Sequence, residues 1–248
     1  ERVPTVRLHA IFRQSEQSQI IVNAHRVLSG AAPLPPPLGQ DSDFYIVPAE
    51  TPSRAAELIC TMVHKRIPKK FGLNPVTDIQ VLSPMHRGIC GATQLNEALQ
   101  SELNPDGEKI SASRGFRVGD KVMQIRNDYQ KDVFNGDVGI IVGTSANGAV
   151  IRFEERSVEY ARDEFDSLVL AYAVSVHKSQ GSEYPAVVIP MLTEHWVMLQ
   201  RNLLYTAMTR GKGLVILVGQ MRAISWAAKN IDGFERHTWL SKRMGVHA

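Results

Sequence analysis

A short polar segment in the second half of the chain has the composition of a phosphate-binding loop. Residues 175–185 read SVHKSQGSEYP and lead into an apolar run at 187–189. Hydroxyls and backbone N–H groups in a small polar loop before a buried strand can bind phosphate oxygens. A solvated turn in which Gly181 reverses the chain explains the same residues. Composition alone leaves both interpretations open.

A second segment, RNLLYTAMTRG at 201–211, predicts a helix that ends in an arginine. From that position the guanidinium of Arg210 could reach a neighbouring site. Arginine suits phosphoryl transfer because its planar group is always charged. The alternative is that Arg210 only complements the negative end of its helix dipole. Taken alone, the pattern favours this alternative.

The sequence contains no phosphate loop. No G-x-x-x-x-G-K-[ST] segment is present, and Lys212 follows the predicted helix and is followed by glycine rather than by a hydroxyl residue. No apolar strand ends in paired acidic residues, since Asp163 and Glu164 follow a segment of poor strand character. These 248 residues alone therefore lack the usual groups for binding Mg²⁺·ATP and activating water.

The elements that must position the two segments form an alternating α/β pattern. Helices are expected at 16–28, after Thr51 and Pro52, through 95–103, at 198–209 and at 221–229, and strands at 44–47, 78–83, 168–170, 187–189 and 214–218. Apolar strands that alternate with helices predict a parallel sheet covered on both faces. The proline-rich stretch 31–39 predicts an extended surface connection, or a ligand for a proline-binding partner.

A β-rich stretch interrupts this pattern between about residues 115 and 163. Short strands are expected at 122–125, 138–142, 150–153 and 158–160, and Asn-Gly pairs at 135–136 and 147–148 predict hairpin turns. We expect a small β-barrel of about 50 residues inserted into the α/β domain. The expected division is 1–111 and 166–248 for the α/β domain and 112–165 for the barrel.

Composition excludes several classes of protein. The apolar fraction of 44% and the charged fraction of 21% are those of a globular domain. No apolar run is long enough to span a membrane, and Cys60 and Cys90 are too few for a disulfide framework, so a cytoplasmic location is expected. The chain begins without Met, so it is expected to be an excised fragment. Its net charge of +3 equals that of the stretch 114–131.

Several segments together resemble superfamily 1 DNA helicases of the RecD/TraA type. HKSQGSE at 177–183 is similar to their motif V, LYTAMTR at 204–210 to motif VI, and IFRQ at 11–14, followed by a helix with Asn23, to motif IV. SPMHRG at 83–88, FRVGDKVM at 116–123, NDY at 127–129 and VFNGD at 133–137 resemble further segments of the RecD branch, which includes exodeoxyribonuclease V alpha subunits. The segments occur in the family's order and cover nearly the whole chain.

The resemblance implies a RecA-like parallel sheet, related to P-loop NTPases, with helices on both faces and an inserted Src-homology-3-like barrel. In these helicases two RecA-like domains hold ATP between them. This chain would be the second domain, and it would begin just after the segments that bind most of the ATP and Mg²⁺. Its partners would be the N-terminal RecA-like domain, single-stranded DNA and other nuclease–helicase subunits, with no membrane.

The resemblance also implies roles for individual residues. Arg13 and Arg210 would be arginine fingers that reach the γ-phosphate, and Gln180, Gly181 and Glu183 would lie near the nucleotide. Contacts with single-stranded DNA are expected at Ser83, Pro84, Arg87, Asn96, Asn127, His177, Lys178 and Ser179. Charged strands and core aromatics of a small barrel explain the region around Asn127 as an alternative. No residues have metal-ligand spacing, so no metal site is expected within the chain.

The function expected from the resemblance is that of the C-terminal motor domain of an ATP-dependent, 5′ to 3′ DNA helicase in DNA repair or recombination. The isolated chain is expected to be inactive because it lacks the phosphate loop. One alternative is a DNA-binding or interaction module that kept the fold and lost the motor, although such a module has no need for Arg13, Gln180, Glu183 and Arg210. Another is the helicase part of a conjugative relaxase.

Overall fold

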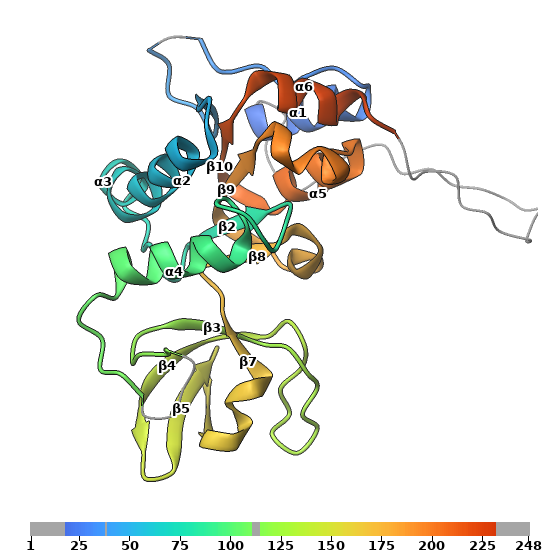
Figure 1. Ribbon diagram of the computed structural model, residues 1–248. Helices are drawn as coiled ribbons and strands as arrows, with labels where there is room; N and C mark the ends of the chain where they lie inside the picture. Colours follow the sequence, from blue (N-terminus) through green and yellow to red (C-terminus); the bar gives the residue numbers. More distant parts are fainter. Residues whose placement is uncertain (1–17, 38, 111–114, 232–248) are drawn as a thin grey trace, which may run out of the picture.

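A computed structural model describes residues 18–37, 39–110 and 115–231, which form two lobes (Figure 1). The first lobe contains a five-stranded sheet in the order β1-β10-β9-β2-β8. All neighbouring strands in it are parallel. The strands are β1 (Phe44–Pro48), β10 (Gly211–Gly219), β9 (Tyr184–Met191), β2 (Ile79–Ser83) and β8 (Ala173–Ser175).

Helices cover both faces of this sheet (Figure 1). One face packs against α1 (Gln19–Leu28), α5 (Arg201–Met208) and α6 (Met221–Lys229). The other packs against α2 (Pro52–Thr61), the π-helical turn η1 (Met62–Arg66), α3 (Ile67–Phe71) and α4 (Ala92–Leu103). Because both faces are covered, β2 is buried along its whole length, and β9 and β10 are buried almost throughout. The expected parallel sheet between two layers of helices is confirmed.

Polar side chains hold the ends of these helices. The hydroxyl of Thr51 accepts a hydrogen bond from the backbone N–H of Arg54, which caps α2 as expected. Arg201 donates to the carbonyls of Ala228 (2.8 Å), Leu28 (3.4 Å) and Lys229 (3.4 Å). Arg201 thus binds carbonyl groups at the C-terminal ends of both α1 and α6, where such groups have no partner within the helix.

The side chain of Asn23 anchors the proline-rich stretch. Its amide oxygen accepts from the backbone N–H of Leu34 (2.7 Å), and its amide nitrogen donates to the carbonyl of Leu34 (3.1 Å). Prolines have no N–H to donate, and Leu34 is the one residue of 33–37 that is not proline, so within this part of the run it alone can pair in both directions. Leu34 itself is exposed, which agrees with a connection that runs over the surface.

The second lobe contains a five-stranded antiparallel sheet in the order β6-β5-β4-β3-β7. Its strands are β3 (Lys121–Gln124), β4 (Val138–Ser145), β5 (Gly148–Phe153), β6 (Arg156–Ala161) and β7 (Leu168–Leu170), and the 3-10 helix η2 (Arg162–Ser167) precedes β7. A separate apolar core includes Phe116, Ile151 and Phe165. β4 and β5 join through a tight turn, since Ser145 pairs with Gly148, which confirms the second expected hairpin. The first Asn-Gly pair also forms a turn, since the N–H of Asp137 donates to the carbonyl of Phe134 (3.0 Å), but this turn lies within the long loop 125–137 and does not join β3 to β4 directly.

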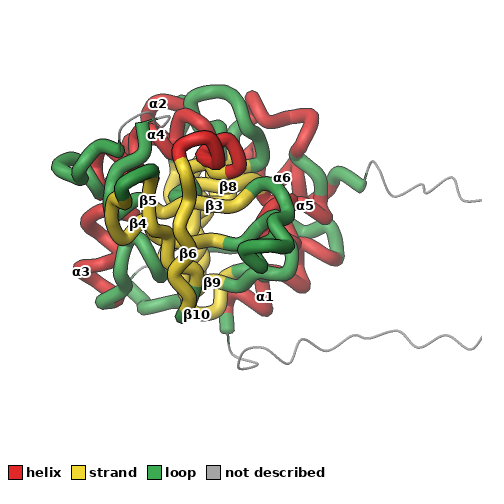
Figure 2. Tube along the Cα trace, turned by 90° about the horizontal axis from the view of Figure 1, so that it is seen from below, coloured by secondary structure: helices red, strands yellow, loops and turns green. Residues whose placement is uncertain are grey.

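The chain enters the second lobe after α4 and returns to the first lobe between β7 and β8. β7 pairs with β3 in the second sheet, and β8 pairs with β2 in the first, so the chain crosses between residues 170 and 173. Seen from below, the strands of the second lobe lie in front of those of the first, and helices surround them (Figure 2). The two lobes therefore stack along the long axis of the molecule.

A buried polar joint connects the lobes. The carboxylate of Asp120 accepts hydrogen bonds from the side chains of Gln100 (2.5 Å) and Asn104 (2.7 Å), both from α4 or its end, and from the hydroxyl of Tyr172 (3.0 Å). Burial and the Asp120 carboxylate raise the pKa of Tyr172. The next residue, Lys121, is also buried, and its ammonium donates to the carbonyl of Ile79 in β2 (3.2 Å).

Candidate functional site

The two polar segments singled out in the sequence lie side by side. Gly211, at the start of β10, pairs with Tyr184, at the start of β9. The segments that precede these parallel strands therefore meet, and the N–H of Tyr184 donates to the carbonyl of Arg210 (2.9 Å). The first segment forms the 3-10 helix η3 (Val176–Ser179) and then a turn in which Gly181 has a φ of +88°, a conformation that favours glycine.

The guanidinium of Arg210 is half-buried at this junction. It donates to the carbonyls of Thr206 (3.2 Å) and Ser182 (3.1 Å). Within the described ranges, no carboxylate forms an ion pair with Arg210, whereas Glu183 beside it pairs with Lys212 at 3.3 Å. Among the described residues, therefore, no carboxylate compensates the charge of Arg210 where the two segments meet, and Gln180 and Gly181 are exposed on the same turn.

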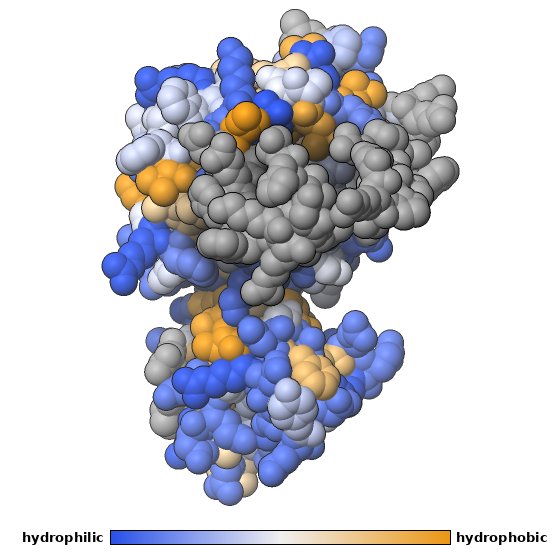
Figure 3. All heavy atoms as spheres, turned by 90° about the vertical axis from the view of Figure 1, so that its right-hand side faces the viewer, coloured by the Kyte–Doolittle hydropathy of each residue, from blue (hydrophilic) through white to orange (hydrophobic). Residues whose placement is uncertain are grey.

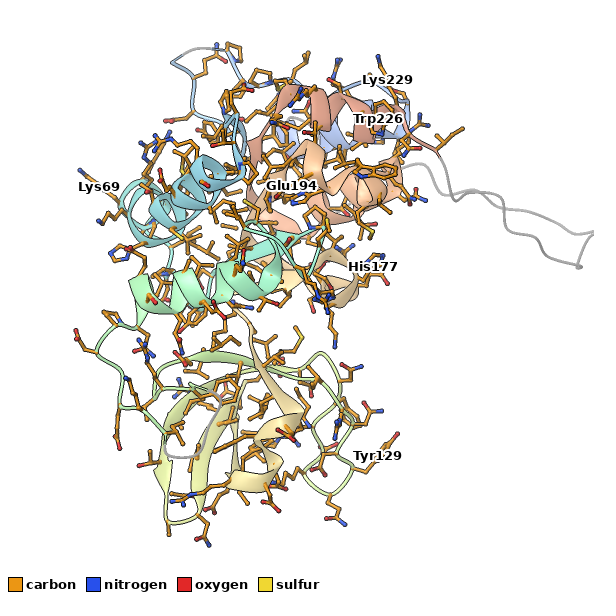
Figure 4. All side chains as sticks on the ribbon, in the orientation of Figure 1. Lys69, Tyr129, His177, Glu194, Trp226 and Lys229 are labelled. Atoms are coloured by element: carbon orange, nitrogen blue, oxygen red, sulfur yellow. The ribbon has the colours of Figure 1, made fainter. Side chains whose placement is uncertain are left out.

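The opposite end of the first segment carries an exposed histidine and a lysine. His177 is exposed and points outward at the lower edge of the first lobe (Figure 4). The ammonium of Lys178 donates to the amide oxygen of Asn135 in the β3–β4 loop (2.9 Å). This contact joins η3 to the second lobe. Ser179, by contrast, is buried, and its hydroxyl donates to the carbonyl of Val176 (2.7 Å).

The loop after β2 is stabilised by the residues that were expected to contact DNA. Ser83 is fully buried, and its hydroxyl lies 2.8 and 2.7 Å from the carbonyls of Met85 and Cys90. Pro84 is buried and Arg87 is exposed. Gly91 is required where this loop folds back before α4, because a Cβ there would lie 2.4 Å from the carbonyl oxygen of Arg87.

Asn96 is buried on α4 and binds the crossing between the two sheets. Its amide nitrogen donates to the carbonyls of Leu170 (3.0 Å) and Ala173 (2.8 Å), and its oxygen accepts from the N–H of Ala173 (2.8 Å). The polar atoms of Ser83, Asn96 and Ser179 are thus used within the chain, and Pro84 has no exposed surface to offer. The direct side-chain contact with DNA expected for these four residues is therefore not what their burial favours, because buried side chains of this kind position the loops around them.

Asn127 is exposed in the β3–β4 loop. Its oxygen accepts from the N–H of Asn135 (2.9 Å), and its nitrogen lies 3.3 Å from the hydroxyl of Tyr129. Through Asn135 it is connected to Lys178. The structure therefore brings Asn127 and Lys178 to one region and places Arg210 at the other end of the same polar segment. Arg13 lies outside the described residues.

A pocket of about 380 Å³ lies between the lobes. Apolar residues from both lobes form its floor, and His86, Thr93, Ser175 and Lys178 contribute polar groups. On the face shown in Figure 3, hydrophobic side chains gather where the surface narrows between the lobes. Ser175 belongs to the polar segment predicted from the sequence, whereas Thr93 and Asn135 were not predicted as site residues. Asn135 had a signal, its place in an Asn-Gly pair, but that signal was interpreted as a hairpin turn.

The described residues provide no cluster of three His, Cys, Asp or Glu side chains that could hold a metal ion. His195 is buried, and burial lowers its pKa to about 4, so this side chain stays neutral at physiological pH. Among the described helices, none is long and apolar enough to cross a membrane.

Comparisons with known proteins define the class. Residues 170–218 match the UvrD-like helicase C-terminal domain, and residues 95–155 match the ATP-dependent RecD-like DNA helicase SH3 domain. A crystal structure of the Pif1 helicase from Bacteroides in complex with ADP-AlF3 and ssDNA has a similar fold, with a TM-score of 0.50 and 18% identity over 85% of this chain and 51% of that chain. The first lobe thus has a RecA-like fold, and the second is an inserted SH3-like domain.

Similarity to individual proteins gives the family. The ATP-dependent RecD2 DNA helicase of Deinococcus radiodurans is 33% identical over 248 residues, which are 100% of this chain and 33% of that protein. The RecBCD enzyme subunit RecD of Mycolicibacterium smegmatis is 30% identical over 152 residues, 61% of this chain and 27% of that protein. Over its full length the chain is thus similar to a RecD-like DNA helicase. It spans about a third of the length of these relatives.

Proposed function

We propose that the chain is the C-terminal motor domain of an ATP-dependent DNA helicase that moves 5′ to 3′ along single-stranded DNA. The family supports the reaction, and the RecA-like sheet supports the role of a motor domain. In this proposal residues 1–111 and 166–248 form the RecA-like unit and residues 112–165 form the inserted barrel, except that β7 (Leu168–Leu170) pairs with β3 and is counted with the barrel sheet. The N-terminal RecA-like domain of the full-length protein would supply the other half of the ATP site.

The observation that carries the proposal is the position of Arg210. Its guanidinium binds two neutral carbonyl groups and, within the described residues, no carboxylate, so its charge is available for a phosphate. A fixed guanidinium at a domain edge can stabilise the charge that develops on a transferred phosphoryl group. Arg210 is therefore proposed as an arginine finger, and Arg13 as a second one.

The surroundings of Arg210 fit a nucleotide better than a metal ion. Gln180 and Gly181 are exposed beside it, and together with Glu183 they would hold the base and sugar side of ATP. Glu183 already pairs with Lys212, and the described residues gather no acidic cluster that could hold Mg²⁺. The Mg²⁺ ligands and most phosphate contacts are accordingly assigned to the N-terminal domain. Hydrolysis of bound ATP would supply the free energy for movement.

The proposed DNA surface runs along the side of the molecule that carries His177. His177, Lys178, Arg87 and Asn127 are the candidates for contact, because their side chains reach the surface or its edge. Phosphates of a single strand bind such cationic and amide groups without regard to sequence. The buried side chains of Ser83, Pro84, Asn96 and Ser179 would hold the loops beneath them.

Salt-dependent binding of single-stranded DNA tests the DNA surface. Labelled oligo-dT is titrated with the chain at several salt concentrations, for wild type, Lys178→Ala and Lys69→Ala. Loss of one phosphate contact should reduce the slope of log K against log salt by about 0.7. Lys69 is the control because it is exposed on the opposite side of the molecule (Figure 4). Wild-type binding that ignores salt, or equal effects of the two variants, would contradict this assignment.

ATP hydrolysis by the full-length protein tests the finger. Arg210→Ala is expected to lower DNA-stimulated turnover by about a thousandfold or more. Arg210→Lys should recover little of it, because lysine lacks the planar fork. Arg54→Ala is the control, since Arg54 is exposed on α2 and pairs with Glu57. Normal turnover by Arg210→Ala would rule out the finger assignment.

The proposal also includes partner subunits and a cellular location. A relative is a subunit of the RecBCD enzyme, so a complex with other nuclease–helicase subunits is included among the proposed partners. A reducing, cytoplasmic location is proposed because Cys60 and Cys90 are both free thiols.

A further inference from the structure

Two aromatic side chains form an exposed pair in the β3–β4 loop. Tyr129 is 78% exposed and Phe134 is 40% exposed. Their rings meet edge to face, with centroids 6.0 Å apart and an interplanar angle of 76°. The core of the second lobe has its own aromatic residues, which are buried. Neither Tyr129 nor Phe134 belongs to that core, and the largely exposed ring of Tyr129 is open to a ligand.

The loop holds this pair in place before any ligand binds. The backbone groups of Asp128 and Val133 pair with each other in both directions, at 2.7 and 3.0 Å. The amide of Asn127 lies against both the Tyr129 hydroxyl and the N–H of Asn135. The N–H of Phe134 donates to the carboxylate of Asp137 (2.8 Å). A ligand would thus meet rings that are already ordered, which lowers the entropic cost of binding.

The pair stands next to the proposed DNA surface. The bond from Lys178 to Asn135 fixes the loop against η3. In Figure 4, Tyr129 and His177 project from the same side of the molecule, one from each lobe. A cation and an exposed ring at neighbouring positions match the two parts of a nucleotide, the phosphate and the base.

We propose that Tyr129, supported at its edge by Phe134, is a stacking platform for one nucleobase of the single strand. The inference rests on the proposed function and adds a base contact to its backbone contacts. Stacking on a ring face does not depend on which base is present, so the platform would fix the strand against the barrel without adding sequence specificity. Lys178 would bind a phosphate beside the stacked base.

Removing the bases from the DNA gives a direct test. Binding of the chain is measured to labelled oligo-dT and to an abasic oligomer of the same length, at one salt concentration. Tyr129→Ala should weaken binding to oligo-dT by about tenfold and leave binding to the abasic strand unchanged. Tyr129→Trp should restore oligo-dT binding, because it restores a ring. Trp226→Ala is the matched control: this ring is 60% exposed, on α6 of the other lobe, and both affinities should stay as in wild type.

The outcomes separate this inference from the proposed function. Equal losses on the two strands would mean that Tyr129 only shapes the loop, and an unchanged oligo-dT affinity would mean that no base stacks there. Either result overturns the platform while salt-dependent DNA binding survives. A wild-type chain that binds neither strand would overturn both proposals. Matching far-UV circular dichroism spectra would show that a loss of binding does not come from unfolding.

Discussion

Asn96 illustrates how one polar side chain can organise a junction between two sheets. Its amide satisfies the carbonyls of Leu170 and Ala173 and the N–H of Ala173. These groups lie where the chain leaves the second sheet and enters the first, so they cannot all belong to a regular ladder. An amide has the donors and the acceptor that such a crossing needs. The polar atoms of Asn96 are therefore occupied within the structure.

Replacing Asn96 with leucine should destabilise the protein strongly. Leucine has a similar size, but it would leave three buried backbone groups without partners, and each costs about 1 to 3 kcal/mol. We expect the free energy of unfolding to fall by about 3 kcal/mol or more, as measured by urea denaturation. Ser101→Ala, at an exposed position on the same helix, should change it by less than about 0.5 kcal/mol. Similar unfolding midpoints for the two variants would contradict this account of Asn96.

Residue types alone indicated where part of the candidate site could lie, although a solvated turn explained the same residues. His177 and Lys178 stand out as polar residues beside a buried strand, and the structure leaves His177 exposed and Lys178 half-exposed. The burial of Ser83 and Ser179 could not be predicted, because a hydroxyl suits a phosphate and a backbone carbonyl equally well. Which partner it meets depends on how the loop closes. The contact of Asn135 with Lys178 was missed because the two residues are far apart in the sequence and only the fold brings them together.

At the scale of elements, the sequence predicted best where periodicity is strong. The last helix, at 221–229, and the apolar strands β9 and β10 follow from continuous or amphipathic runs. β8 was missed because its three residues are too few to show a pattern. The π-helical turn at Met62–Arg66 was missed as well, because its residues continue the apolar stripe of α2. The local hydrophobic pattern thus predicts that a helix or strand is present, but it does not predict which backbone groups are hydrogen-bonded.

The β3–β4 loop shows a different limit. Asn-Gly at 135–136 favours a tight turn, and Gly136 does adopt a positive φ of +107°. The strands, however, pair Lys121 with Ile140 and Met123 with Val138, so all of residues 125–137 lie outside the ladder. The turn at Asn135-Gly136 was predicted correctly, whereas the length of the loop around it was not. The point at which the paired strands end depends on which residues face the core. The loop contributes one such residue, since Val133 is buried in the core of the second lobe.

At the scale of the whole molecule, Lys121 couples the joint between the lobes to pH. It is buried, and burial lowers its pKa from 10.5 to about 8, while Asp78 partly opposes that shift. Below pH 8 the ammonium is charged in the folded and the unfolded chain, so the cost of burying the charge is fully present. Above pH 10.5 the side chain is neutral in both states and this cost is absent. Stability should therefore rise between these two values.

The pH dependence should disappear when Lys121 is replaced by methionine. Relative to Lys121→Met, the wild type is expected to gain about 3 kcal/mol of unfolding free energy between pH 8 and pH 10.5. Urea denaturation across that range measures the difference, in which groups common to both proteins cancel. An exposed lysine has no burial cost, so Lys69→Met should follow the wild type closely. Parallel pH profiles for wild type and Lys121→Met would show that the buried charge does not affect the joint.

The order of the strands also affects how the molecule forms during its synthesis. β1 pairs only with β10, the last strand of the described chain. On the ribosome, residues 44–48 must therefore wait until residues 211–219 have been made. The strands of the second lobe all lie between residues 121 and 170, so that lobe can fold earlier, because local contacts form first. The growing chain thus passes through a stage in which the inserted lobe is complete while apolar strands of the larger lobe are still unpaired and open to aggregation or chaperones.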